Sequence, residues 1–150
     1  MQMTEMQKER LNDLIKRLEN GEYKQAKGML RVDDRYCISG VMCDLSGMGE
    51  WVEYNNECVE DDNECVEDDN EKTYLSFSYN TPNGFHYMTL EPSEVSKHFG
   101  LNMGASGILT QANDDGASFI RMAHALRIYL EDNGESTRWL KILNVYYCEN

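Results

Sequence analysis

An acidic tandem repeat near the middle of the chain most limits what this sequence can fold into. Residues 56–62 read Asn-Glu-Cys-Val-Glu-Asp-Asp, and residues 63–69 repeat the same seven residues. Residues 56–71 hold nine acidic side chains and no Lys or Arg. One Val and one Cys per copy cannot form the apolar seam of a coiled coil, which needs about three or four heptads. We therefore predict a solvated acidic loop at 56–71, inserted into a single domain that spans residues 1–150.

The charge of the chain is concentrated in this insertion. The formal net charge is -13, from 27 acidic and 14 basic residues, and the nine acids of the repeat supply most of the excess. Such a surplus of carboxylates favours a partner with a basic surface and argues against direct binding to nucleic-acid phosphates. We expect the acids of the two complete copies to contact that partner: Glu57, Glu60, Asp61, Asp62, Glu64, Glu67, Asp68 and Asp69.

The composition is that of a globular protein with its own core. The chain has 150 residues, of which 41% are hydrophobic. No apolar run approaches the roughly 20 residues of a membrane span, and the first residues lack the apolar stretch of a secretory signal. We therefore expect a soluble protein of the cytoplasm that has no membrane partner.

The five cysteines show none of the CxxC spacing that zinc and redox sites use. Free thiols are therefore expected, with no metal and no cofactor, although pairs close in sequence could still meet if the chain turns back. The cysteines are Cys37, Cys43, Cys58, Cys65 and Cys148.

Helical patterns occur on both sides of the insertion. Thr4 and Gln7 form a capping box, and an apolar face follows before Gly21. Apolar residues at helical spacing predict a short buried helix over 36–45, in which Gly40 allows close approach by a neighbour. Together the patterns predict about five helices, which begin near Thr4, Tyr36, Pro92, Ser118 and Ser136, while residues 101–116 are expected to be irregular and residues 145–148 fit a helix or a strand.

Alternating patterns predict a small antiparallel sheet. Residues 74–79 and 85–90 alternate with a period of two, and Pro82-Asn83-Gly84 between them supplies turn chemistry, so residues 74–90 form a hairpin. A strand near 51–54 is expected to pair with it. The predicted fold class is α+β, a hairpin and one further strand packed against helices in one domain.

Several motifs resemble a family of small uncharacterised proteins encoded by bacteriophages and prophages. The most specific is Tyr36-Cys-x-x-Gly-Val-x-Cys-Asp-Leu45, and a later Asn113-Asp-x-Gly-x-Ser-Phe119 agrees with the family's second half. The resemblance extends over residues 8–130, and the acidic repeat falls where the family has a variable loop. It implies a phage gene product and no particular reaction.

The histidines and cysteines are not arranged for chemistry in the sequence. His86, His98 and His124 lie far apart and join no metal-spaced set, so structural roles are expected. Cys43 on a buried helix would have a raised pKa, which opposes nucleophilic catalysis. Asp44 at the end of that helix is interpreted as a buried acid that caps a neighbouring backbone.

A glycine-rich stretch leaves a second functional class open. Residues 100–107 are superficially like a phosphate cradle, but they lack the context of a P-loop, and 113–116 is more typical of a turn than of a calcium site. The alternative hypothesis is a small-ligand (nucleotide) binding protein or enzyme that uses segment 100–116 with helix 36–45. Its candidate ligand-binding residues are Tyr36, Asp44, Asn113 and Asp114.

The sequence favours a protein that binds and does not catalyse. Carboxylates along a strand can occupy an Arg/Lys groove meant for phosphates. Our hypothesis is therefore a phage-type accessory protein of the host cytoplasm that inhibits a host macromolecule, such as a defence nuclease, with the acidic loop as a nucleic-acid mimic. The oligomeric state is not indicated.

Thiol chemistry tests the prediction about the cysteines. All five should titrate as free thiols, with Cys37 and Cys43 reacting only after mild unfolding because a buried thiol is protected from reagent. The measurement is a thiol titration with and without denaturant. Stoichiometric zinc, or a disulfide that resists cytosolic reductants, would contradict it.

Overall fold

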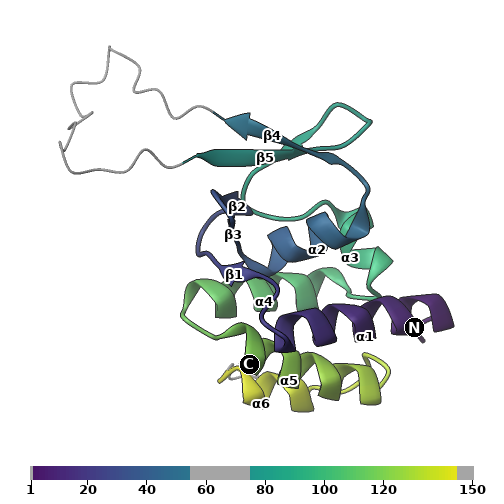
Figure 1. The fold of residues 1–150 in the computed structure, drawn as a ribbon. Coiled ribbons are helices and arrows are strands. Elements are labelled where there is room, and N and C mark those ends of the chain that lie inside the picture. Colours follow the sequence, from purple (N-terminus) through teal and green to yellow (C-terminus); the bar gives the residue numbers. More distant parts are fainter. Residues whose placement is uncertain (1, 55–74, 145–150) are drawn as a thin grey trace, which may run out of the picture.

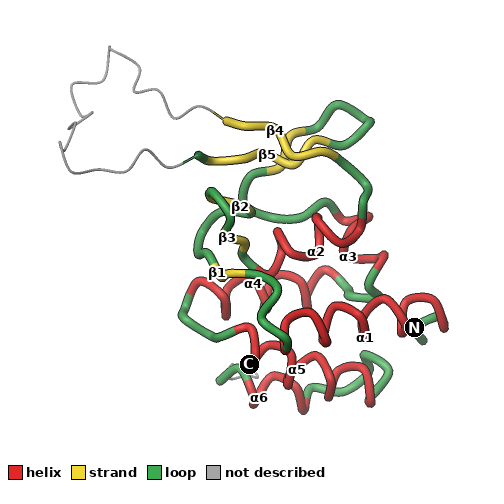
Figure 2. Tube along the Cα trace, viewed as in Figure 1, coloured by secondary structure: helices red, strands yellow, loops and turns green. Residues whose placement is uncertain are grey.

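The computed structural model describes residues 2–54 and 75–144, and over these residues the chain forms six helices and six short strands. The strands gather at one end and most of the helices at the other (Figures 1 and 2). This arrangement confirms the predicted α+β class. The acidic loop predicted at 56–71 and the stretch 145–148 lie outside the described residues.

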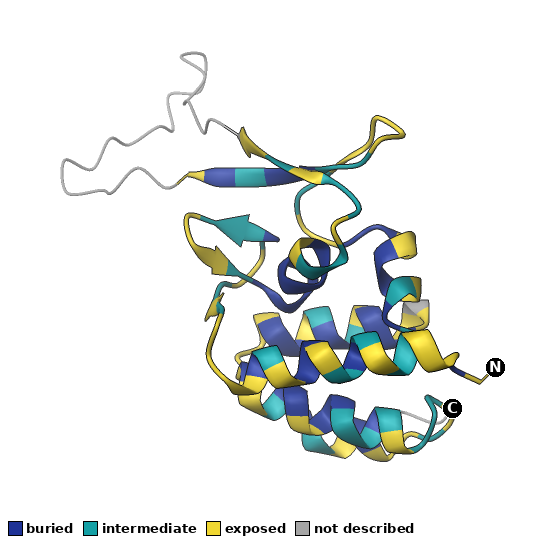
Figure 3. Cartoon of the chain, turned by 45° about the vertical axis from the view of Figure 1, so that its right-hand side comes forward, coloured by how far each residue is buried: buried dark blue, intermediate teal, exposed yellow. Residues whose placement is uncertain are grey.

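Helix α1 (Glu5–Glu19) begins and ends as its sequence predicts. The Thr4 hydroxyl accepts from the backbone N–H of Gln7, and the Gln7 side chain accepts from the backbone N–H of Thr4. Its apolar face packs against α5 (Phe119–Glu131), which Ser118 caps. Figure 3 shows buried positions on the facing sides of these helices. The buried residues of α1 are Leu11, Leu14, Ile15 and Leu18.

Helix α2 (Ile38–Ser46) is the buried helix that lies between the strands and the other helices (Figure 1). It begins two residues later than predicted, because Tyr36 belongs to a strand and Cys37 is the N-cap. Gly47, with φ 65°, ends it in the left-handed conformation that glycine favours. Gly40 is needed for packing, since a Cβ atom there would lie 1.8 Å from the carbonyl oxygen of Leu30.

The sheet has the order β1-β3-β2-β5-β4, with β6 also paired to β5. The strands that the sequence predicted pair antiparallel, and the sheet also contains a parallel pair, β1 with β3, that the sequence did not indicate. Strands of two residues are too short to show an alternating pattern, so the sequence did not reveal the first three. The strands are β1 (Lys24–Gln25), β2 (Arg31–Val32), β3 (Arg35–Tyr36), β4 (Glu50–Tyr54), β5 (Ser76–Asn80) and β6 (His86–Tyr87).

The predicted hairpin is present, with a shorter second strand. β5 pairs antiparallel with β4 and with β6, and Gly84 turns the chain at φ 88°. The second strand stops after Tyr87, because the carbonyl of Met88 instead accepts from the backbone N–H of Leu30. This hydrogen bond joins the end of the hairpin to Leu30, the residue that precedes β2.

Residues 103–114 form helix α4 (Met103–Asp114), so the prediction of an irregular segment was wrong there. The Asn102 side chain caps the helix by accepting from the backbone N–H of Ala105. Ala105, Leu109 and Ala112 are buried at helical spacing. Small residues on this face let α4 pack closely on α2, and that packing stabilises a helix of weak intrinsic propensity.

Two short helices complete the fold. α3 (Ser93–His98) begins directly after Pro92, and Gly100 turns the chain at φ 74° beyond its end. α6 (Arg138–Ile142) follows a turn at Asn133 and Gly134, and buries Trp139 and Leu140 against α5. No helix among the described residues is long and apolar enough to span a membrane.

The contact at Gly40 gives a stability test. Gly40→Ala should lower the free energy of unfolding by at least about 2 kcal/mol, because the new methyl group meets the Leu30 backbone, which cannot rotate away. Chemical denaturation measures the change. Gly107→Ala in α4 is the control: nothing lies within 4 Å of the new atom, so helix propensity should stabilise that variant by about 0.5–1 kcal/mol. Equal effects of the two variants would contradict the close approach.

Candidate functional site

Asp44 lies exposed on α2, so its interpretation as a buried capping acid was wrong. Its position in the helix turns it out of the core, away from its buried neighbour Cys43. One carboxylate oxygen accepts from the Tyr23 hydroxyl at 2.7 Å, and the other accepts from the Trp51 indole N–H at 3.0 Å. The carboxylate therefore joins α2 to β4 and to the segment before β1.

Tyr36 belongs to an aromatic cluster beside this carboxylate. Its ring meets Tyr23 edge-on with centroids 5.1 Å apart, and Trp51 at 5.8 Å. The Trp51 ring also packs on Tyr79, with centroids 4.9 Å apart. Partial burial, together with the bond to Asp44, raises the pKa of the Tyr23 phenol, so Tyr23 stays a hydrogen-bond donor at neutral pH.

Arg31 extends the aromatic cluster across the sheet. Tyr36, Arg31 and Phe77 occupy paired positions on three neighbouring strands. The guanidinium carbon lies 3.9 Å from the centroid of the Phe77 ring and 5.2 Å from that of Tyr36. No carboxylate forms an ion pair with Arg31 in the described part of the chain, so aromatic stacking and one bond to the Asp33 carbonyl hold it.

Asn113 is fully buried near the end of α4 and has a hydrogen-bond partner for each polar atom. Its side-chain oxygen accepts from the backbone N–H of Ile38 at 3.0 Å and from the Gln25 amide at 3.1 Å. Its amide nitrogen donates to the carbonyl of Ala26 at 2.7 Å. These bonds give Asn113 a structural role, since a ligand would have to displace them.

Asp114 is exposed and binds the segment 25–28, which Asn113 also contacts. Its carboxylate accepts from the backbone N–H of Gly28 at 2.8 Å. The four predicted ligand residues therefore form two separate groups: Tyr36 and Asp44 share the aromatic cluster, while Asn113 and Asp114 hold residues 25–28. No hydrogen bond between described residues joins one group directly to the other.

The cysteines of α2 lie in the core. Cys37 and Cys43 are both free and buried. Burial raises the pKa of Cys37 to about 11 and raises that of Cys43 further, as predicted for Cys43. Both thiols therefore stay protonated at neutral pH and pack as small apolar side chains.

The three histidines lie on three different elements. His86 is exposed on β6, and its Nδ1 lies 2.7 Å from the side-chain oxygen of Asn80. His98 on α3 packs on Phe99, and burial lowers its pKa. His124 is exposed on α5.

The eight predicted partner-binding acids, Glu57 to Asp69, lie outside the described residues. The strands before and after them, β4 and β5, are described and lie side by side. Tyr54, the last residue of β4, pairs with Ser76, the first of β5, so the chain leaves and rejoins the sheet at one place. Glu50 and Glu53 on β4 are exposed and add carboxylates to this strand.

The sequence did not reveal three members of the cluster around Asp44. Tyr23, Arg31 and Trp51 come from separate segments, and only the sheet pairing and α2 bring them together. The one available signal was the aromatic residue at position 51 in a predicted strand. It indicated a strand and not a contact with Asp44.

Comparison with known proteins identifies one family. Residues 6–130 match the model of a domain of unknown function, DUF8296. No curated protein and no solved structure matches the chain.

The bonds of Asn113 give a second stability test. Asn113→Asp should lower the free energy of unfolding by about 3 kcal/mol or more, because a buried carboxylate would face the Ala26 carbonyl without a donor between them. Urea unfolding at neutral pH measures this. Asp114→Asn is the matched control and should cost less than about 1 kcal/mol, since its amide oxygen can still accept from Gly28. If Asn113→Asp lowers the free energy of unfolding no more than Asp114→Asn does, the structural role assigned to Asn113 is wrong.

Proposed function

We propose that this chain, which belongs to the DUF8296 family of domains of unknown function, is a phage-type accessory protein that binds and inhibits a host macromolecule with a basic surface. The observation that carries the proposal is the concentration of charge. Nine of 27 acidic residues fall within 56–71, where no basic residue compensates them. Carboxylates gathered in this way attract a groove lined with Arg and Lys.

The sheet supports the proposal by fixing where the acidic segment is attached. Tyr54 and Ser76 are paired neighbours, so the stretch of chain that contains the acidic segment leaves and rejoins the sheet at one end of the β4–β5 pair. The exposed Glu50 and Glu53 lie on the strand that leads into it. Figure 1 places this end away from α1, α5 and α6. A partner at this end would therefore leave the helical core undisturbed.

A nuclease that defends the host is the partner class that fits best. Its groove binds nucleic-acid phosphates through basic side chains, and spaced carboxylates can substitute for those phosphates. The resemblance of the Tyr36–Leu45 and Asn113–Phe119 motifs to phage proteins supports a role of this kind. Inhibition then follows from competition for the groove, with no chemical step by this chain.

The alternative, a small-ligand site in segment 100–116 and helix 36–45, has less support. Residues 103–114 form a helix and not a glycine-rich cradle, and Asn102 caps its first turn. Asn113 uses its polar atoms within the fold. A site built from segment 100–116 and α2 would have to break these bonds.

Deletion of one heptad tests the role of the acidic segment. The chain would be immobilised to capture nucleases from host lysate, and association would be followed with and without competing duplex DNA. Deleting residues 63–69 removes four acids and should slow association on the order of tenfold at low salt, with a shallower salt dependence. Duplex DNA should release the captured nuclease.

A neutral variant of the same length separates charge from loop length. It replaces Glu64, Glu67, Asp68 and Asp69 by Gln or Asn and should behave like the deletion, because charge sets the rate. Thermal unfolding should be unchanged in both. If neither variant alters the association rate and DNA does not compete, the acidic segment is a passive insertion and the proposal fails.

A further inference from the structure

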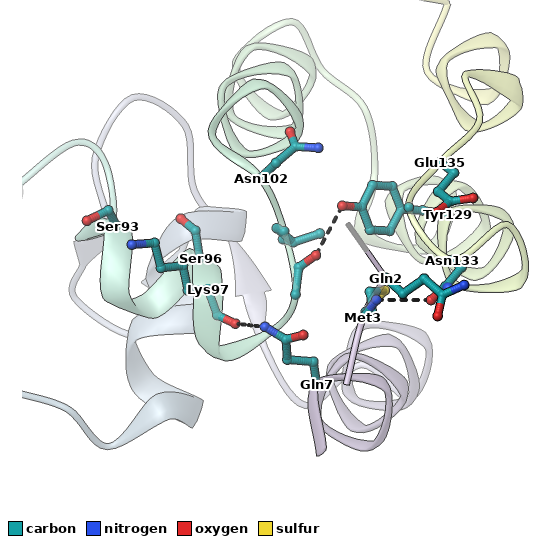
Figure 4. A pocket seen from close by; sticks show the side chains of 13 residues that line it. Gln2, Met3, Gln7, Ser93, Ser96, Lys97, Asn102, Tyr129, Asn133 and Glu135 are labelled. Carbon is teal, nitrogen blue, oxygen red and sulfur yellow. Dashed lines mark hydrogen bonds between the residues drawn. The ribbon is translucent and has the colours of Figure 1, made fainter. Parts of the chain in front are cut away.

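A cavity of about 620 Å³ lies at the helical end of the molecule (Figure 4). Its walls come from the start of α1, from α3, from the link between α3 and α4, and from the end of α5 with the turn that follows. Its volume falls within the range of about 300–1,000 Å³ that small-molecule sites occupy. The acidic segment is attached at the β4–β5 edge, so this cavity is a separate feature of the fold.

Two asparagines present amide donors to the cavity. The side-chain oxygen of Asn102 accepts from the backbone N–H of Ala105 at 2.8 Å, and that of Asn133 accepts from the backbone N–H of Met3 at 3.2 Å. Each amide is therefore oriented by its oxygen, and neither amide nitrogen donates to another described residue. The two N–H₂ groups remain as oriented donors at the cavity wall.

Two buried hydroxyls present acceptors. The Tyr129 hydroxyl donates to the carbonyl of Gly100 at 3.1 Å. The Ser96 hydroxyl donates to a carboxylate oxygen of Glu91 at 2.9 Å, and its oxygen lies 3.5 Å from that of the Ser106 hydroxyl. Because each hydroxyl has one hydrogen, which it donates within the protein, its oxygen can meet a ligand only as an acceptor. The backbone N–H of Asn102 already approaches the Tyr129 oxygen and uses one of its two lone pairs, so one remains for a ligand. Tyr129 is 2% exposed and Ser96 and Glu91 are each 4% exposed, so neighbouring atoms fix these directions. Glu91 does not line the cavity and acts as a positioning residue for Ser96.

The lining is close to neutral in a strongly acidic protein. Lys97 and Glu135 are its two charged residues and have opposite signs, and both are exposed. The other polar lining groups are amides and hydroxyls. A charged ligand would therefore meet no excess of opposite charge in this cavity. A sugar hydroxyl both donates and accepts hydrogen bonds, so it matches a wall that offers donors and acceptors.

We propose that the cavity formed by α1, α3, the 100–102 link and α5 binds an uncharged sugar. The Asn102 and Asn133 amides donate to its hydroxyl oxygens, and the Ser96 and Tyr129 oxygens accept from its hydroxyl hydrogens. The polar groups are already oriented by bonds within the protein, so binding does not have to order them. The sugar is the ligand of a second site, independent of the proposed contact with a basic partner.

Titration of the full chain with D-glucose and D-ribose tests the site. ¹H–¹⁵N spectra should show saturable shifts confined to residues 2–7, 93–102 and 129–135, with a Kd of about 1 mM or below for at least one sugar. Glycerol is the small polyol control and should shift these signals only weakly. No saturable shift up to about 50 mM of either sugar, or shifts spread over the surface, would overturn the proposal.

Asn102→Asp removes the donor while keeping the cap. An aspartate oxygen still accepts from Ala105, so α4 should persist, but the loss of the N–H₂ donor should weaken binding at least about tenfold. Asn133→Asp repeats the test at the other wall and keeps the acceptor for Met3. Circular dichroism checks the fold of each variant.

The same substitution at Asn83 is the matched control. Asn83 lies exposed in the β5–β6 turn, where its side-chain oxygen accepts from Thr81 and aspartate can do the same. Asn83→Asp should bind the sugar as the wild type does. Equal binding by all three variants would overturn the site. Deletion of residues 63–69 should leave the titration unchanged, so failure here and failure of the proposed inhibition are distinguishable.

Discussion

A buried amide, that of Asn113, joins the helices to the first strand of the sheet. Asn113 satisfies the N–H of Ile38, one of the donors that the start of α2 leaves without an intrahelical partner, and it also binds Gln25 and the Ala26 carbonyl. α4, α2 and the first strand therefore meet at one side chain. The chain from β1 to β3 has few apolar residues of its own, so its position depends on this polar contact, on the bond from Gly28 to Asp114, and on Leu30, which packs against Gly40.

The fold separates two kinds of surface. At the sheet end, Asp44 and the aromatic cluster stiffen the strands beside the attachment of the acidic segment. At the helical end, amides and hydroxyls surround a nearly neutral cavity. The first surface suits long-range attraction, which acts over about a Debye length, and the second suits contacts that require fixed directions. The two proposed interactions thus rest on different physics and on different residues.

The sequence predicted the elements whose local signals were strong. The capping box of α1, the Ser118 cap of α5 and the turn at Gly84 each combine a periodic pattern with a specific boundary residue. α4 was missed because Gly, Ser and Ala dilute its apolar face, and its stability comes from close packing on α2. The candidate site was harder, because Asp44 meets Tyr23 and Trp51 only after the sheet has formed. The cavity joins residues from both ends of the chain and left no local pattern.

The pairing of Tyr54 with Ser76 also affects how the sequence of this protein can change in evolution. The register of β4 and β5 is set by further pairs along both strands, such as Trp51 with Tyr79. These pairs do not depend on the number of residues between the two strands. Slippage during DNA replication can therefore add or remove whole seven-residue copies without shifting the sheet. Each copy carries four carboxylates, so the charge of the inserted segment can evolve in discrete steps while selection on the core stays the same.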